Sequence, residues 1–388
     1  KIERLGTLIK VQELKENKNQ LISFINFAWE IYQHDSHWVP PLRNDLLKTL
    51  LGRDITQKIH CGPHAFLMVH ENEKYLGRML VGINKKKNQR RNQNTGYFGF
   101  LEMVDSYEVF RYLMDYAVNW LQKHKINSIV GPICPDDDIE GRGLLIKGFN
   151  SAPVLMNSYN PFYYKKIIDQ YGLEKHTDFY AYYCDKLALL KARVEKVTHF
   201  ARQKYNFRID KINLKKPDQE IKDIVEIMNA IVAYDREEDN GFEFANPPTV
   251  EELTLEVKRF MPFIDQEMIY IARSEGMPIG FVFAFPDYNP ILRKMDGKLY
   301  PFGIFKFLWF KNKLEGIRGF AQFVSPKFRN KAVNAAIFDK LLGVAIEKKY
   351  KYIEGSLISE NNLKSRRIFE NNGLKPYKVY RVYQKSFA

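Results

Sequence analysis

Cysteine is scarce in this sequence, and its three cysteines, Cys61, Cys134 and Cys184, lie far apart. This spacing excludes a disulfide framework or a cysteine-rich zinc motif, and it favours a reducing compartment. No apolar run reaches the roughly 20 residues that a membrane helix needs, and the first residues show no signal-peptide pattern. We therefore expect a cytoplasmic protein without membrane-spanning helices.

Histidine is absent from most of the second half, because all eight histidines lie at or before His199. A general base there must be a carboxylate, or a water molecule held by one, unless the first half lends a histidine. His34 with His37 and His60 with His64 have helical spacings, but the sequence offers neither pair an obvious third ligand. We expect no metal site.

The length and the charge of the chain limit the number of domains and the kinds of partner that we expect. A chain of 388 residues exceeds the size at which one hydrophobic core usually keeps growing, which predicts two domains. Sixty Lys and Arg against 46 Asp and Glu leave a net charge of +14, which favours phosphorylated cofactors, anionic lipid or nucleic acid as partners. Aromatic residues make up 14% of the chain, enough for a large core or for a site that binds an apolar ligand.

Both halves of the chain alternate strands and helices in a similar order, which predicts an α/β protein with a mixed sheet. In the first half we expect strands at 5–13, 65–70, 75–83, 96–103, 127–130 and 179–184, and helices at 21–31, 107–124 and 161–171. In the second half we expect strands at 207–213, 267–273, 278–285, 317–324, 352–358 and 378–385, and helices at 190–204, 218–233, 249–260, 331–349 and 362–371.

The two halves also share a residue pattern at an offset of 201 positions. This offset aligns the Gly-Leu turn at Gly172 with the one at Gly373, and Tyr182 with Tyr383. Each half therefore ends in a helix, a Gly-Leu turn and an aromatic-rich strand, which indicates a duplicated unit. We expect the two domains at 1–188 and 189–388.

The segment 320–337 reads as a strand, a short basic loop and a helix. The start of such a helix presents unpaired N–H groups and the positive end of the helix dipole, to which Arg329 and Lys331 add charge. About 30 residues later follows Asn362, with Ser365, Phe369 and Gly373. Together the two segments resemble the acyl-CoA-binding core of the GNAT superfamily, the GCN5-related N-acyltransferases. On this resemblance the cofactor-binding residues are Val324, Arg329, Asn330, Lys331, Ala332, Val333, Asn334, Asn362, Ser365 and Phe369.

The whole chain resembles a group of bacterial proteins with two GNAT-like domains. The segments that carry this resemblance are 38–42, 98–102, 143–149, 159–164 and 286–289. The resemblance implies two tandem GNAT-like domains, with an acyl-CoA site in the second. The first domain has no equivalent of the basic loop, so we expect it to be degenerate and to serve as a wall or lid.

Three positions depart from the family pattern. Ala332 and Asn334 stand where the family has glycines that let phosphate approach the backbone, so each adds a Cβ there. Phe369 replaces the tyrosine that in many members protonates the leaving thiolate. The acid must then come from elsewhere, and Tyr380 or Tyr383 on the last strand are the candidates.

Several carboxylates are candidates for the base. Glu360 follows a strand at the place where the central strands of the family separate, and Asp287 ends the strand at 278–285. Glu238 and Asp239 lie in a loop that resembles the acceptor side of the family. The family also polarises the thioester carbonyl with a backbone N–H, here near Val324.

Two surface segments point to possible partners. Residues 85–91 carry five basic side chains between two strands, a composition that is more typical of a solvated loop than of a nucleic-acid site. Residues 300–313 combine five Phe or Trp rings with three lysines. This segment is either core or the wall of an acyl or lipid pocket, or it makes peripheral contact with an anionic membrane.

The sequence thus predicts an enzyme that transfers an acyl group from acetyl-CoA or a longer acyl-CoA to an amine on a small molecule or lipid, without a metal. Two alternatives stay open. Fem-type transferases, which use aminoacyl-tRNA, also have tandem GNAT-like domains, and the positive charge suits tRNA, although the Arg329 loop favours CoA. The altered loop also allows a protein that binds CoA or a lipid without turnover. The sequence does not determine the acceptor or the oligomeric state.

Overall fold

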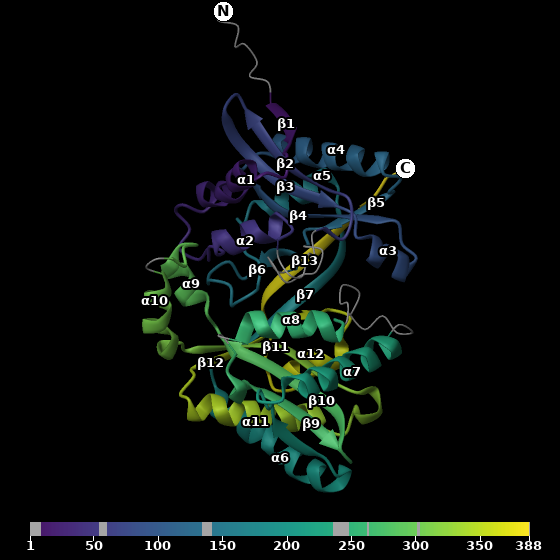
Figure 1. Ribbon diagram of the computed structural model, residues 1–388, viewed down its shortest axis with the longest axis vertical. Helices are drawn as coiled ribbons and strands as arrows, with labels where there is room; N and C mark the ends of the chain where they lie inside the picture. The colour runs from purple at the N-terminus through teal and green to yellow at the C-terminus, as the bar shows by residue number, and fades with distance from the viewer. Residues whose placement is uncertain are drawn as a thin grey trace, which may run out of the picture. The chain divides into compact units, whose positions relative to one another are not determined.

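The computed structural model describes residues 9–53, 60–133, 142–235, 248–261, 264–300 and 303–387 (Figure 1). The chain forms two compact units. Unit 1 comprises Lys1–Phe179, Ile291–Leu308 and Lys378–Ala388, and unit 2 comprises Tyr180–Pro290 and Trp309–Tyr377. The last strand of the chain, β13 (Pro376–Ser386), therefore begins in unit 2 and continues into unit 1.

Unit 1 is a mixed sheet with helices on both faces. Its strands are β1 (Ile9–Glu13), β2 (His64–Glu71), β3 (Lys74–Gly82), β4 (Thr95–Met103), β5 (Ser128–Gly131) and β6 (Leu144–Lys147), together with parts of β7 (Glu174–Cys184) and β13. They run in the order β1-β2-β3-β4-β5-β13, and β6 also pairs with β13. Only β4 and β5 are parallel among these described pairs.

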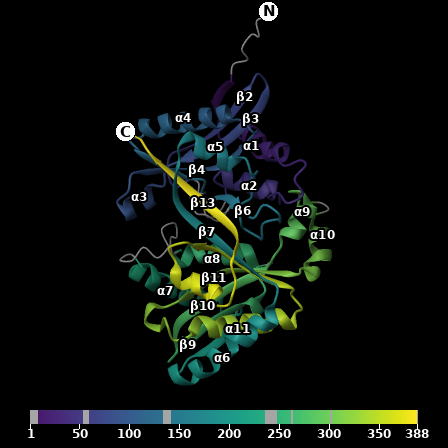
Figure 2. The same cartoon turned by 180° about the vertical axis from the view of Figure 1, so that it is seen from behind.

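The alternation of side chains along β2 explains the two layers of helices in unit 1. Leu67 and Val69 face the core beneath α4 (Tyr107–Lys123) and α5 (Tyr164–Tyr171), which Figure 2 shows beside these strands. Phe66 faces the other way and meets Phe24 of α1 (Lys18–Ile31), with the two ring centroids 5.3 Å apart. The remaining helices that lie wholly or mainly in unit 1 are α2 (Arg43–Leu50), α3 (Lys85–Arg91), α9 (Asn289–Met295) and α10 (Gly303–Phe310).

Unit 2 has the same kind of architecture. Its strands are β8 (Arg208–Lys211), β9 (Ile269–Ser274), β10 (Met277–Pro286), β11 (Gly316–Val324) and β12 (Tyr352–Ser359), in the order β12-β11-β10-β9-β8. Its helices are α6 (Leu187–Tyr205), α7 (Pro217–Asp235), α8 (Val250–Phe260), α11 (Val333–Glu347) and α12 (Leu363–Glu370). The strand pair β11–β12 is parallel, and the pairs β10–β11, β9–β10 and β8–β9 are antiparallel.

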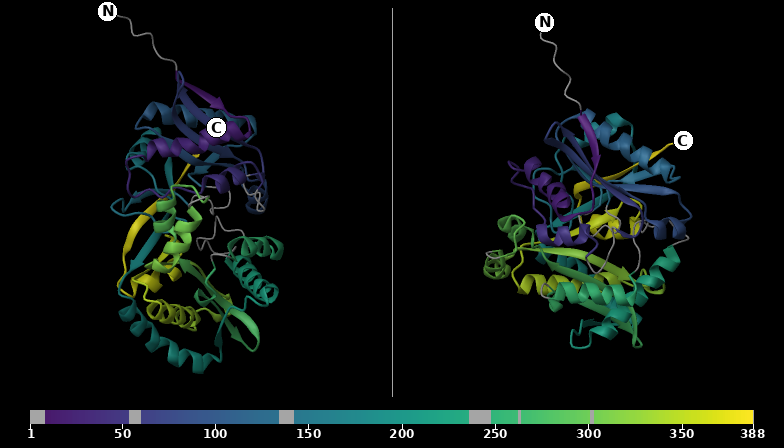
Figure 3. Two further views of the ribbon diagram at one scale, coloured as in Figure 1. Left: turned by 60° about the vertical axis from the view of Figure 1, so that its left-hand side comes forward. Right: turned by 45° about the horizontal axis from the view of Figure 1, so that its top comes forward.

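The core of unit 2 has two layers, one on each face of this sheet. In α11, Val333, Ala336, Ile337 and Leu341 follow helical spacing, and all four are buried in one core with residues of α6, β9 and β10. On the other face Ile227 of α7 packs with residues of β9 and β10. Figure 3 shows α7 and α8 on one side of β9 and β10, and α6 and α11 on the other.

The predicted α/β fold with a mixed sheet is confirmed, and so is the equivalence of the two Gly-Leu turns. Gly172 ends α5 and Gly373 follows α12, and both have φ +81°, a left-handed conformation that only glycine adopts without strain. The expectation of a loop at residues 85–91 is wrong, because the side chain of Asn84 caps a short helix, α3. Four further elements, β6, α2, α9 and α10, are not predicted from the sequence.

In the part of the chain that the structure describes, every helix is too short or too polar to cross a bilayer.

Candidate functional site

The strands β11 and β12 are paired only at their beginnings. The parallel register runs from Gly316 opposite Tyr352 to Gly319 opposite Gly355, after which β11 continues to Val324 beside β10 alone among the described pairings. The antiparallel register between β10 and β11 slips at the same point, which leaves Phe320 as the extra residue of a β-bulge. Because a bulge bends its strand, it explains why β11 leaves β12 here. The separated strands leave one backbone edge of β11 open to a ligand.

The loop that follows β11 ends in a strained helix start. Ala332 is the N-cap residue of α11, and its φ of 55° and ψ of 19° are left-handed. No side chain caps this helix, so the N–H groups of its first turn face the loop with the positive end of the helix dipole. Arg329 and Lys331 precede the helix in the same loop and add positive charge; Arg329 is half-buried, and the ammonium of Lys331 lies 4.6 Å from the ring centroid of Phe328. This arrangement suits a phosphate or pyrophosphate.

Ala332 therefore stands in a conformation that favours glycine, the residue that the family has at this position. We expect Ala332→Gly to raise the free energy of unfolding by about 0.5–1 kcal/mol, because it relieves the left-handed strain. Ala335→Gly, three residues further into the same helix, should lower it by about 1 kcal/mol. Urea denaturation of both variants tests this, and a loss of stability in both would show that Ala332 is unstrained.

Asn334 also lies in the first turn of α11. Its backbone carbonyl accepts a hydrogen bond of 2.9 Å from Nε2 of Gln322, which ties the helix start to β11. Its side-chain Oδ1 is buried and has no hydrogen-bond partner among the described residues. Asn334 therefore places an unsatisfied buried acceptor in the first turn of α11.

The second predicted segment begins α12. Oδ1 of Asn362 accepts a hydrogen bond of 3.0 Å from the backbone N–H of Ser365, so Asn362 is the N-cap residue of this helix. Phe369 stacks on Tyr182, with ring centroids 4.7 Å apart and an interplanar angle of 15°. A tyrosine ring therefore lies beside the position of the family's tyrosine, although that position itself is Phe369.

The environment of Tyr182 keeps its hydroxyl protonated. Burial, together with a hydrogen bond of 2.9 Å to Glu370, raises the pKa of Tyr182 to about 12. The hydrogen bond from Tyr182, with further bonds from Arg366, lowers the pKa of Glu370. Tyr182 is not among the site residues predicted from the sequence. The sequence feature that could have indicated Tyr182 is its alignment with Tyr383 in the internal repeat.

The two candidate bases Glu360 and Asp287 lie at opposite ends of β12. Glu360 follows the last residue of β12, at the end where β11 and β12 have separated, and it is half-buried. Asp287 is 3% exposed, and its backbone N–H donates to the carbonyl of Gly316 at the beginning of β11. Its carboxylate accepts a hydrogen bond of 2.8 Å from the hydroxyl of Tyr352. Burial and the charge of Asp287 raise the pKa of Tyr352. The structure therefore brings Glu360, but not Asp287, to the separated ends of the strands.

The remaining candidates are spread over the chain. Tyr380 and Tyr383 are buried in unit 1, where their strand, β13, pairs with β6 and β5. Burial and the charge of Asp169 raise the pKa of Tyr383. The Arg329 loop belongs to unit 2. Glu238 and Asp239 lie outside the described residues.

A buried ion pair joins β11 and β12 just before they separate. Nη1 of Arg318 lies 2.6 Å from Oε2 of Glu354, and the two side chains are 4% and 0% exposed. Glu354 also accepts hydrogen bonds of 2.7 Å from Ser356 and 3.1 Å from Tyr377. Sequence reasoning missed this cluster. The sequence signal for this cluster is a single charged residue inside each of two otherwise uncharged strands.

Several phenylalanines gather at the bulge. The ring of Phe320 lies 5.4 Å from that of Phe285 and 5.8 Å from that of Phe283 (centroid distances), and Phe281 lies 5.3 Å from Phe323 on the same strands. Phe281 is buried, whereas Phe320 remains 36% exposed and Phe283, Phe285 and Phe323 are half-buried. An incompletely buried aromatic cluster at the opening is suited to an apolar ligand.

These features together suit a ligand that joins a pyrophosphate to an extended chain with amide groups. The uncapped start of α11 with Arg329 and Lys331 suits the pyrophosphate, and the open edge of β11 suits the extended amide arm. Ala332 adds a methyl group at the phosphate position, but its backbone already has the conformation of a glycine.

Comparison with solved structures identifies the fold of the chain. A tandem GNAT protein from the clavulanic acid biosynthesis pathway superposes with a TM-score of 0.55 at 11% identity, covering 98% of each chain. The GCN5-related N-acetyltransferase from Sphaerobacter thermophilus superposes with a TM-score of 0.50 at 10% identity, covering 97% of this chain and 95% of that one. This chain thus has the fold of the GNAT superfamily, in tandem, as the sequence resemblance implies.

Two proteins are similar to this chain over nearly its whole length. Protein YghO of Escherichia coli is 28% identical over 381 residues, covering 95% of this chain and 93% of that protein. The bacterial ceramide synthase of Caulobacter vibrioides is 26% identical over 380 residues, covering 95% of each. No protein-family model matches the chain.

Proposed function

We propose that this protein is an acyl-CoA-dependent N-acyltransferase whose acceptor is a lipid amine. The observation that carries the proposal is the opening between β11 and β12, which begins at the bulge at Phe320 and leads to the uncapped start of α11. The tandem GNAT fold and the similarity to a ceramide synthase support it.

In this proposal, different residues of unit 2 bind different parts of acyl-CoA. The N–H groups at the start of α11, with Arg329 and Lys331, bind the pyrophosphate. The open edge of β11 up to Val324 hydrogen-bonds the amide groups of the pantetheine arm, as an added strand would. Asn362 uses its Oδ1 to cap α12, which leaves its amide nitrogen to meet a carbonyl of the same arm.

The amine must lose a proton as it attacks the thioester, and Glu360 is the carboxylate that we assign to this step. It lies at the separated end of β12 and is half-buried, so a water molecule can connect it to the amine. Asp287 already accepts hydrogen bonds from Tyr352 and from the backbone N–H of Asn289, which assigns it to holding the beginnings of β11 and β12 in place. The C–N bond of the amide forms as the C–S bond breaks, and CoA leaves as a thiol.

The apolar surface of the protein and the similarity to a ceramide synthase both support a lipid acceptor. Ceramide is the amide of a fatty acid with a long-chain amino alcohol, and the half-buried phenylalanines at the bulge suit such chains. Helix α10 exposes Phe305 by 67%, Leu308 by 52% and Trp309 by 70%. Lys306, within α10, and Lys313, just beyond it, add positive charge. We assign this helix to contact with an anionic membrane surface that carries the acceptor.

Release of CoA thiol tests this proposal. With an acyl-CoA and a long-chain amino alcohol in anionic vesicles, the wild-type protein should release thiol, and Glu360→Gln should reduce kcat by about 10²–10⁴-fold. The double variant Phe305→Ser/Trp309→Ser should lose turnover on the vesicle-borne amine. Phe162→Ser, which removes another exposed ring, should not.

Three outcomes would count against the proposal. Turnover of short water-soluble amines only would exclude the lipid acceptor. CoA binding without thiol release across a broad amine panel would indicate a binding protein. Activity that depends on aminoacyl-tRNA would replace the proposal with the Fem-type reaction.

A further inference from the structure

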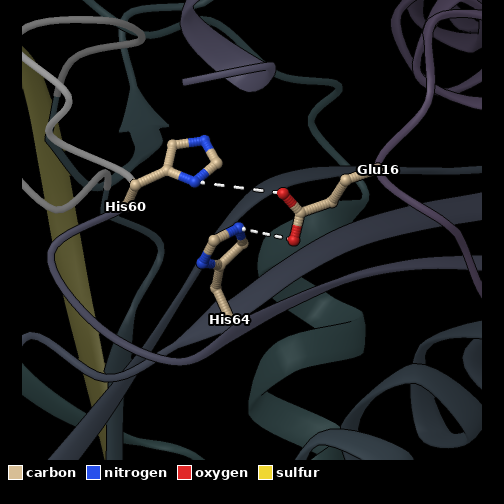
Figure 4. Close-up of side chains that lie close together, drawn as sticks. All are labelled: Glu16, His60 and His64. Carbon is tan, nitrogen blue, oxygen red and sulfur yellow. Dashed lines mark ion pairs between the residues drawn. The ribbon is translucent and has the colours of Figure 1, made fainter.

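Three side chains of unit 1 that lie far apart in the sequence converge on one point (Figure 4). Nε2 of His64 lies 3.1 Å from Oε1 of Glu16, and Nδ1 of His60 lies 3.9 Å from Oε2 of the same carboxylate. The three ligand atoms that these residues offer lie within 4.8 Å of one another. Among the described residues this is the single group of at least three His, Cys, Asp or Glu side chains with that property.

The far nitrogen of each ring is held by a backbone carbonyl. Nδ1 of His64 lies 3.0 Å from the carbonyl oxygen of Gly62, and Nε2 of His60 lies 3.2 Å from that of Leu50. A carbonyl can only accept a hydrogen bond, so each of these nitrogens carries the proton. In a neutral ring the other nitrogen is then bare, and in both rings it faces Glu16.

An unprotonated imidazole nitrogen and a carboxylate oxygen are both hydrogen-bond acceptors, so their lone pairs repel each other when they face one another. The side chain of His64 is 7% exposed, and its Nε2 is buried and makes no hydrogen bond, although it lies beside Glu16. A buried acceptor in that position calls for a cation between the groups. A backbone carbonyl that orients the far N–H of each histidine is the usual outer shell of a metal-bound imidazole.

We propose that Glu16, His60 and His64 form a binding site for Zn²⁺. Two imidazole nitrogens and one carboxylate oxygen are a zinc ligand set that leaves a fourth position for water. In tetrahedral zinc sites the ligand atoms lie roughly 3.3 Å apart, which follows from Zn–N distances of about 2.0–2.1 Å, and the separations of 3.1 and 3.9 Å here bracket that value. Glu16 is 44% exposed, so the ion has a path from solvent.

The position of the site in unit 1 indicates what the metal does. Glu16 follows the edge strand β1, and His64 begins β2, its partner in the sheet. His60 lies in the turn before β2, where the backbone of Gly52, at φ +63°, packs so closely that a Cβ there would lie 2.9 Å from the imidazole. The ion would fasten the segment after β1 to the turn before β2 and so stabilise the edge of this sheet.

Zinc binding to the full-length protein tests the proposal. After treatment with EDTA and dialysis, the wild-type protein should bind one equivalent of Zn²⁺, and its midpoint of thermal unfolding should rise. Mg²⁺, which requires oxygen ligands, should produce no such rise. Substitution of Co²⁺ should give the visible absorption bands of a four-coordinate site with nitrogen and oxygen ligands.

Matched variants separate this site from adventitious binding. His64→Gln and Glu16→Gln should each weaken zinc binding by more than the roughly 10–100-fold that the loss of an outer-shell partner costs. His70→Gln should bind zinc like the wild type, although His70 also lies on β2 and also has Nδ1 beside a backbone carbonyl, 2.7 Å away. Glu16 is half-exposed, so its variant should fold even if the variant of the buried His64 does not.

Two results would overturn the proposal. Failure of the wild-type protein to bind zinc would mean that the two histidines and Glu16 interact with one another without a metal. Equal zinc affinity in the wild type and in Glu16→Gln would place the bound zinc elsewhere on the protein.

Discussion

Glu354→Gln should lower the free energy of unfolding by about 3–5 kcal/mol. Arg318 and Glu354 are both buried, so the substitution leaves the guanidinium in the protein interior without a counter-charge. Ser356 and Tyr377 also lose an ionised acceptor. Urea denaturation measures the loss, which is several times that of an ordinary surface substitution.

Two further variants show whether this loss comes from the buried charge. Replacing both partners, as Arg318→Met with Glu354→Leu, should recover most of the stability, because no unpaired charge remains. Glu347→Gln, at an exposed position at the end of α11, should change the free energy of unfolding by less than about 0.5 kcal/mol. A loss below about 1 kcal/mol in Glu354→Gln would contradict the role of this pair in joining β11 and β12.

Arg329→Glu should weaken the binding of CoA by at least about 100-fold while leaving the fold intact. The substitution replaces a positive charge beside the start of α11 by a negative one, and a charge-assisted contact alone accounts for about 1.5–3 kcal/mol of binding energy. Titration calorimetry measures the affinity, and an unchanged circular dichroism spectrum shows that the fold is retained.

Lys327→Glu is the matched control for this prediction. It makes the same charge change in the same loop, but Lys327 is exposed, and screening by salt should limit its effect to less than about 10-fold. Equal losses in the two variants would mean that CoA senses only the overall positive charge. Unchanged affinity in Arg329→Glu would remove the phosphate site from this loop.

The helix that follows β11 could be predicted from the sequence because its signals are local. A strand that leads into Pro326, a basic loop and the apolar spacing of Val333, Ala336 and Ile337 specify a strand–loop–helix unit without knowledge of the rest of the chain. The glycine at Gly373 was informative for the same reason, since a left-handed φ at the end of a helix is a local requirement.

Features that depend on the pairing of distant segments could not be predicted. The bulge at Phe320 depends on the register between β10 and β11, and no residue type in this segment indicates that register. Asp287 and Glu360 both follow the end of a strand, so the sequence predicts both as candidate bases. Because β10 runs antiparallel to β11, however, β10 ends beside the beginning of β11, away from Glu360. Tyr383 follows the Arg329 loop in sequence, yet its strand completes unit 1.

The third residue beside His60 and His64 was hidden for the same reason. Glu16 follows β1, and only the antiparallel pairing of β1 with β2 brings it to the two histidines. The sequence alone therefore gave no metal site, whereas the structure supplies a ligand set whose occupancy can be measured.

Titration calorimetry of the wild-type protein with CoA, acetyl-CoA and acyl-CoAs of increasing chain length, below their micelle-forming concentrations, tests the central claim most directly. We predict one equivalent of each ligand per chain, with a common contribution from the CoA moiety and an affinity that grows with the length of the acyl chain as it buries apolar surface. Absence of binding for the whole series would contradict the account, because the loop from Arg329 to Asn334 would then hold no pyrophosphate.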